Sequence, residues 1–211
     1  MECNIIIEEL ETCLGDLAKE RSIFHSEADF QFALSQIIQK RHPNWKIRLE
    51  KKENIKEDSK NYVDITISTE KFKIAIELKY KTKNSSKQTI SWEGEKFKLA
   101  NQLAQDLGRY FFLKDVRDLE QVKKQKDYDF AYAIFLTNDS SYWEEGRKDT
   151  MDKEFRINER KIISGQRDWN NGNEWTKKYE LLEIMGKYVM KWKNFSSLDN
   201  HLFKYLILEI K

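Results

Sequence analysis

Proline and glycine are scarce in this chain of 211 residues, which has one proline, Pro43, and seven glycines. That scarcity excludes collagen-like repeats and proline-rich or flexible linkers, so we expect a single domain over residues 1–211. No apolar run reaches the length of a membrane span, and the first residues lack the basic stretch of a signal peptide. We therefore expect no membrane partner.

Cysteine and histidine are too few for two common kinds of cross-link. Cys3 and Cys13 cannot build a disulfide framework, and their place on one predicted helix makes a bridge between them sterically unfavourable. This usage is typical of a reducing compartment, so we expect a cytoplasmic protein. His25, His42 and His201 lie far apart in the sequence, which argues against a zinc site.

Neither sign of charge dominates the chain. Lys and Arg number 38 against 36 Asp and Glu, which leaves a net charge of +2. This balance excludes a globally basic nucleic-acid binder, so any binding of anions must come from a local patch. Hydrophobic residues at 39% and aromatic residues at 13% indicate a globular protein.

The hydrophobic period changes from helical to alternating after Pro43. Ser26, with Asp29 three residues later, has the spacing of a capping box at a helix start. The pattern predicts helices over 4–20, 26–42 and from 94 or 95 to 124, and strands over 45–50, 61–68, 71–80, 130–136 and 202–210. A hairpin is expected at 155–163, whereas 179–192 is ambiguous between helix and strands. The order predicts an α/β fold with a mixed sheet.

Asp64, Glu77 and Lys79 are the strongest site candidates. The spacing of an acid two residues before a lysine occurs five times in this charged chain, so only its context is informative. Strand alternation places Glu77 and Lys79 on one face of 71–80, and Asp64 lies on the same face of the neighbouring strand 61–68. We expect Asp64 and Glu77 one diagonal step apart, at roughly 7 Å.

These residue types suit metal-dependent chemistry on phosphate. Two carboxylates can hold Mg²⁺, with Mn²⁺ as the alternative, and the metal activates water and neutralises phosphate charge. A lysine beside them can orient the water or stabilise the developing charge. The competing interpretation is an exposed sheet face with ordinary charges.

Residues 62–67 (YVDITI) and 74–80 (IAIELKY) resemble the core motif of the PD-(D/E)XK nuclease superfamily, the restriction-endonuclease-like fold. The resemblance covers about 25–137 and implies an αβββαβ catalytic core, preceded by a helix within 1–24. It implies metal-dependent hydrolysis of phosphodiester bonds in DNA, less often RNA, leaving 5′-phosphate ends. Asp64 and Glu77 would be metal ligands, with the Leu78 carbonyl as a further ligand and Lys79 as the catalytic lysine. Val63 stands where the motif's name has proline.

Glu27 lies on the buried side of the predicted helix 26–42. In the fold that the chain resembles, an acid on the N-terminal helix often joins the metal site, which would make Glu27 a fourth catalytic residue. The alternative is a first-turn glutamate stabilised by the helix dipole.

Four polar residues follow the predicted helix 94–124 beside an expected apolar stripe of Leu99, Leu103, Leu107 and Phe111. We expect them to bind substrate, with the guanidinium of Arg109 on a phosphate. The alternative is a solvated helix face with a pair between Asp106 and Arg109. The four candidates are Gln102, Gln105, Asp106 and Arg109.

Residues 138–211 form an extension that the resemblance does not explain, and we expect it to complete the sheet or to contact substrate. Within it, 142–175 interleaves aromatic and cationic residues, which suits nucleic-acid contacts. The same stretch holds eight acids, so the alternative is a mixed-charge surface with a small core of its own. The sequence predicts a nuclease of restriction, defence or repair. Its rivals are a catalytically silent nucleic-acid-binding or assembly module with this fold and a phosphoesterase of small substrates, and a homodimer is left open.

Overall fold

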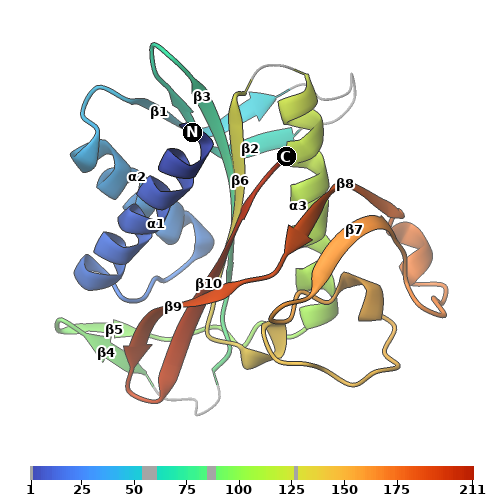
Figure 1. The fold of residues 1–211 in the computed structure, drawn as a ribbon. Coiled ribbons are helices and arrows are strands. Elements are labelled where there is room, and N and C mark those ends of the chain that lie inside the picture. The colour runs from blue at the N-terminus through green and yellow to red at the C-terminus, as the bar shows by residue number, and fades with distance from the viewer. Residues whose placement is uncertain (1, 54–60, 85–88, 126–127) are drawn as a thin grey trace.

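A mixed six-stranded sheet separates two helices from a third in the computed structural model of the chain (Figure 1). The structure describes residues 2–53, 61–84, 89–125 and 128–211, with side chains from residue 5 onward and without that of residue 61. The strands β3 and β6 pair in parallel and all other neighbours are antiparallel. In sheet order the strands are β1 (Lys46–Glu53), β2 (Asn61–Ser68), β3 (Lys73–Lys81), β6 (Phe130–Thr137), β10 (His201–Glu209) and β9 (Trp192–Leu198). The predicted α/β class with a mixed sheet is confirmed.

The alternation of strand side chains divides the core into two layers. Helices α1 (Glu2–Glu20) and α2 (Glu27–Arg41) cover one face, which buries Ile74, Ile76 and Leu78 of β3. Helix α3 (Gln105–Lys124) covers the other face and buries Ala75. Ser26 caps α2 as predicted, because its hydroxyl accepts the amide N–H of Asp29 at 3.1 Å.

The predicted start of the third helix is wrong. The strands β4 (Ile90–Trp92) and β5 (Glu95–Phe97) form a hairpin where the helix was expected, turning at Gly94 with φ of +83°. Helix α3 begins ten residues later, at Gln105, after Ala104 in a left-handed conformation. Residues 90–97 therefore form two short strands, which the helical spacing of the apolar residues after Gly94 did not indicate.

The predicted apolar stripe of α3 is also wrong. Leu103 is 72% exposed and Phe111 is 41% exposed. The buried side of α3 carries Phe112, Leu113 and Val116, which pack against β6 and against β8 (Leu182–Val189). The helix is thus rotated by about one position from the expected orientation, because it must cover β8 as well as the sheet.

The extension contributes strands to two sheets. The predicted hairpin at 155–163 is wrong, since β7 (Ile162–Arg167) pairs with the distant β8. The ambiguous 179–192, which the structure describes throughout, contains β8 and the first residue of β9 and no helix, and β9 and β10 join the main sheet. Cys13 is buried and free, while the side chain of Cys3 lies outside the described residues. In the described part of the chain, every helix is too short or too polar to cross a bilayer.

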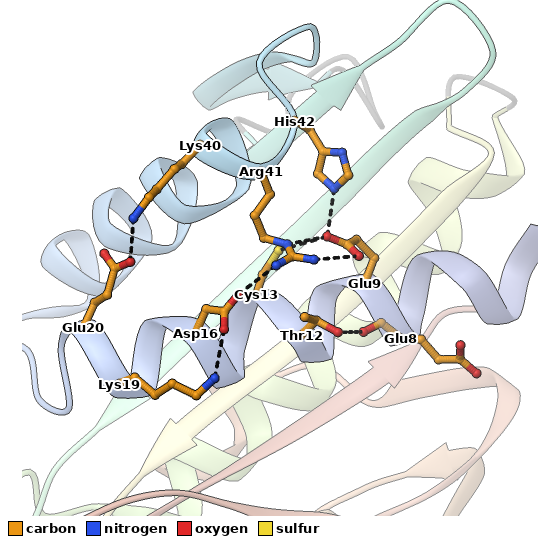
Figure 2. Close-up of polar contacts among 10 residues, drawn as sticks. All are labelled: Glu8, Glu9, Thr12, Cys13, Asp16, Lys19, Glu20, Lys40, Arg41 and His42. Carbon is orange, nitrogen blue, oxygen red and sulfur yellow. Dashed lines mark hydrogen bonds and ion pairs between the residues drawn. The ribbon is translucent and has the colours of Figure 1, made fainter.

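A network of charged side chains ties α1 to α2 (Figure 2). The Glu9 carboxylate accepts from Arg41 Nε at 2.6 Å and contacts His42 Nε2 at 2.8 Å, and Arg41 Nη1 reaches Asp16 Oδ2 at 2.8 Å. Lys40 and Glu20 pair separately at 2.7 Å. The hydrogen bond from Arg41 is the main cause that lowers the pKa of Glu9 below its ordinary value of 4.5.

Replacing Arg41 by methionine is expected to flatten the acid limb of the stability profile. A lowered pKa in the folded state means that Glu9 contributes stability above its unfolded pKa and that this contribution is lost as pH falls through the folded value. Thermal melts between pH 3 and 7 measure the effect. Lys40→Met, which leaves the partners of Glu9 intact, is the control, and identical profiles for wild type and Arg41→Met would contradict the assignment.

Candidate active site

The antiparallel pairing of β2 and β3 ends at Ile65 and Ile76. Beyond this point, side-chain carboxylates accept the β3 N–H groups that main-chain carbonyls of β2 would otherwise accept. Asp64 Oδ2 accepts the Leu78 N–H at 2.6 Å, and Glu27 Oε2 accepts the Tyr80 N–H at 2.7 Å. Two main-chain donors of β3 are thereby satisfied by side chains from β2 and α2. The hydrogen bonds fix both carboxylates at the opening between the strands.

Gln31, one turn after Glu27 on α2, holds the other side of this opening. Its Nε2 donates to the Asp64 carbonyl oxygen at 2.7 Å and to Glu50 Oε1 at 2.7 Å, and the residue is 6% exposed. Sequence reasoning missed Gln31. Its spacing of four from Glu27 on the buried side of the helix is the pattern that could have identified it.

Asp64 and Glu77 face each other on neighbouring strands. Because Ile65 lies opposite Ile76, they occupy the next opposed positions, and the predicted diagonal offset is wrong. The turn spans four residues, since Ser68 is opposite Lys73. The Asp64 carboxyl group is near enough to act on the pKa of Glu77.

Burial and repulsion from neighbouring acids act on both of these carboxyl groups. Burial raises the pKa of Asp64 to about 6, against the opposing effect of the Leu78 N–H. Burial, reinforced by the charge of Asp64, raises the pKa of Glu77 well above its ordinary value. The negative charge of Asp64 therefore disfavours ionisation of Glu77.

Lys79 lies between acids from two layers of the fold. Its Nζ is 2.9 Å from Asp115 Oδ2 on α3 and 4.0 Å from Glu27 Oε1 on α2. Burial alone would lower the pKa of Lys79, but the charges of Asp115 and Glu27 outweigh it and raise the pKa. The lysine is therefore a fixed cation rather than a base.

Asp115 is a site residue that sequence reasoning missed. Burial raises its pKa to about 6, although Lys79 acts in the opposite direction. Asp115 lies three positions after the buried Phe112 and four before the buried Leu119, so it lies on the inner side of α3. An acid on the buried side of the helix was the signal in the sequence that could have identified Asp115.

The four acids around Lys79, namely Glu27, Asp64, Glu77 and Asp115, form what we call the acid cluster. One lysine cannot balance four carboxylates, so the acid cluster carries an excess of negative charge when ionised. Across the described ranges, no three or more His, Cys, Asp or Glu side chains are spaced to hold a metal ion together. The set accordingly offers one facing pair, Asp64 and Glu77, while Glu27 and Asp115 are engaged by the Tyr80 N–H and by Lys79.

The predicted polar line along the third helix does not exist, because Gln102 precedes α3. Gln102 nevertheless lies near the acid cluster, since it lines a cavity of about 230 Å³ together with Glu27 and His25. Its Oε1 accepts the Thr82 N–H at 2.8 Å, just after β3. The substrate-binding role of Gln102 stays a prediction.

Of the other three candidates, Gln105 and Arg109 reach the segment after β6, whereas Asp106 contacts its own helix. Gln105 Nε2 donates to Asp139 Oδ2 at 2.9 Å, and Asp106 Oδ1 accepts the Leu107 N–H at 2.8 Å. Arg109 is 4% exposed and donates to Asp152 Oδ2 at 2.6 Å. The expected pair between Asp106 and Arg109 is therefore wrong.

No protein-family profile, curated protein or solved structure matches this chain. The site is consequently argued from its own geometry.

Replacing Arg109 by alanine is expected to destabilise the fold by about 3 kcal/mol, because it leaves the buried Asp152 carboxylate short of its closest partner. The side chains of Arg109 and Asp152 are 5% and 7% exposed. Chemical denaturation measures the change, with Asp106→Ala as the control. Unchanged stability combined with lost activity would instead place Arg109 in substrate binding.

Asp64→Asn is expected to raise the melting temperature at pH 7.5 in the absence of divalent cations, by about 2–4 °C for each kcal/mol gained. An acid whose pKa is raised on folding destabilises the fold as pH rises from its unfolded value towards about 6, and asparagine removes this penalty. Its side-chain oxygen can still accept the Leu78 N–H. The gain should vanish at pH 4, and an equal or lower melting temperature at pH 7.5 would contradict the charge argument.

Proposed function

We propose that this chain is a metal-dependent nuclease of the PD-(D/E)XK type that hydrolyses phosphodiester bonds, with DNA as the main substrate. The observation that carries the proposal is the facing pair of Asp64 and Glu77 beside Lys79, at the point where β2 and β3 separate. The sequence resemblance and this geometry select the same three residues independently.

The topology is compatible with a restriction-endonuclease-like core. Helix α2 is followed by β1, β2 and β3, then by the hairpin insertion, α3 and β6. The strand β3, which carries Glu77 and Lys79, pairs in parallel with β6 across the α3 crossover. The order therefore supports assigning this core to residues 25–137.

The donor set fits a small, hard divalent cation. Magnesium takes oxygen ligands, and proteins commonly supply one or two carboxylates while waters and substrate phosphates complete the shell. Asp64 and Glu77 supply that number, with the Leu78 carbonyl as a further ligand, and a cation there would relieve their repulsion. Bound Mg²⁺ or Mn²⁺ supplies a water of lowered pKa and neutralises phosphate charge.

The chain's own residues divide the remaining work. Lys79, charged and fixed by Asp115, is suited to stabilise negative charge that develops on the phosphate. Glu27 positions β3 through the Tyr80 N–H and lies 4.0 Å from the lysine ammonium. Gln31 holds the main chain of Asp64 and so acts as a positioning residue.

A catalytically silent nucleic-acid-binding module is the alternative, and one observation favours it. Lys79 is already paired with Asp115 at 2.9 Å, so the lysine must be shared with, or released to, a phosphate before it can act. In a silent module the pair would be purely structural.

Glu77→Gln and Lys79→Met are each expected to lower DNA cleavage by at least about 100-fold in Mg²⁺ or Mn²⁺, because each removes charge required at the reacting phosphate. Cleavage is measured on linear, circular, single-stranded and branched DNA and on RNA. DNA affinity, measured in Ca²⁺, should change less than about threefold. Glu209→Gln, which alters the same acid–x–lysine spacing on β10, is the matched control.

Two outcomes would overturn the proposal. Metal-dependent cleavage that persists in both variants would remove the acid cluster from the reaction. Tight DNA binding by a wild-type chain that cleaves no polynucleotide would favour the silent module.

A further inference from the structure

A basic pocket of about 400 Å³ lies in the segment between β6 and β7. We use this name for the hollow lined by five cationic side chains, Arg147, Lys148, Lys153, Arg156 and Lys161. The sequence left open whether this segment binds nucleic acid or is a mixed-charge surface. The contacts of its acids and rings distinguish the two.

Most acids of the segment already have a hydrogen-bond or ion-pair partner. Asp152 pairs with Arg109 at 2.6 Å and with Arg156 at 3.3 Å. Glu154 pairs with Arg167 at 3.1 Å, and Glu159 accepts the Trp192 N–H at 2.9 Å. The near-equal numbers of acids and bases therefore do not give a neutral pocket.

Four of the lining cations have no acidic partner among the residues that the structure describes: Arg147, Lys148, Lys153 and Lys161. Lys153 and Lys161 are half-buried, and all four line the same pocket, so their like charges gather on one part of the surface. Two acids also line the pocket: Glu154 pairs with Arg167, and Glu145, which forms no ion pair with the described residues, cannot balance four cations. An anion in the pocket would relieve this repulsion.

Arg156 is held in place with one edge available. Its Nη2 donates to Thr150 Oγ1 at 2.9 Å, and its Nε lies 3.3 Å from Asp152 Oδ2. Its Nη1 lies against Gly146, where an added Cβ would come within 1.4 Å of that nitrogen. Glycine thus permits the close approach, and a guanidinium fixed in this way can donate to a phosphate without further ordering.

Two aromatic residues of 142–175, Phe155 and Trp169, are used elsewhere, and none of the described aromatic residues lines the pocket. Trp169 is 7% exposed and packs on Phe155 at 4.7 Å and on Tyr110 of α3 at 5.7 Å between ring centroids. These rings form a small core with α3 and are not free to stack on bases. The basic pocket therefore offers charge without base recognition.

We propose that the basic pocket binds backbone phosphates of a nucleic acid, as a sequence-independent contact separate from the acid cluster. Arg109 and Gln105 tie this segment to the N-terminal half of α3, and in Figure 1 it lies at the end of the sheet where β3 and β6 finish. A strand that passes the acid cluster could reach it from there. The further claim, that the nucleic acid bound here is also the substrate that is cleaved, rests on the proposed function.

The test is a triple variant, Lys148→Ser with Lys153→Ser and Lys161→Ser, compared with Lys46→Ser, Lys71→Ser and Lys187→Ser as a control of equal charge. Anisotropy with labelled duplex DNA in Ca²⁺ should show affinity lower by about 10-fold or more. The slope of log affinity against log salt should fall by about 2 to 3, because three phosphate contacts are lost. The control should keep the wild-type slope, and thermal melts check that both variants fold.

A wild-type slope in the pocket variant would overturn the inference, even if the wild type cleaves DNA. Loss of binding to anionic lipid vesicles with an unchanged DNA slope would also overturn it and assign the pocket to a membrane. The proposed function would fail on a different result, namely no cleavage or cleavage that does not depend on Glu77. In that case a reduced salt slope of the pocket variant would still support phosphate binding by the basic pocket.

Discussion

The separation of β2 from β3 beyond Ile65 and Ile76 is the constraint on which the acid cluster depends. It leaves the N–H groups of Leu78 and Tyr80 without strand partners, and a buried donor left unsatisfied costs about 1–3 kcal/mol. Asp64 and Glu27 remove that cost by accepting them. The same hydrogen bonds that complete the fold therefore hold two carboxylates at a fixed position and orientation.

Satisfying the backbone in this way creates an electrostatic cost elsewhere. Burial in a poorly solvated opening, reinforced by repulsion from neighbouring carboxylates, raises the pKa values of Asp64 and Asp115 to about 6. Lys79 offsets only part of the charge, and it does so by joining α2, β3 and α3 through Glu27 and Asp115. A site that destabilises its own ionised state in this manner is typical of function rather than of stability.

The charged residues outside the acid cluster separate into two kinds by burial. Pairs such as Arg109 with Asp152 are almost fully buried and connect α3 to the segment after β6. Four of the five cations of the basic pocket have no acidic partner within the described structure, because neighbouring acids such as Asp152 and Glu154 pair with other arginines. A chain with a net charge of +2 can in this way present a strongly basic surface locally.

The sequence by itself determined the helices α1 and α2, the strands of the β2–β3 hairpin and the common face of Asp64, Glu77 and Lys79, because these follow from local periods of 3.6 and 2 residues. Their predicted chemistry awaits experiment. Only the tertiary structure decided the partners: Asp115 and Gln31 reach the site from helices distant in sequence, and Arg109 meets Asp152 across 43 positions. The β4–β5 hairpin and the rotation of α3 were likewise set by packing. Such contacts depend on how layers pack, which a local pattern of residues does not encode.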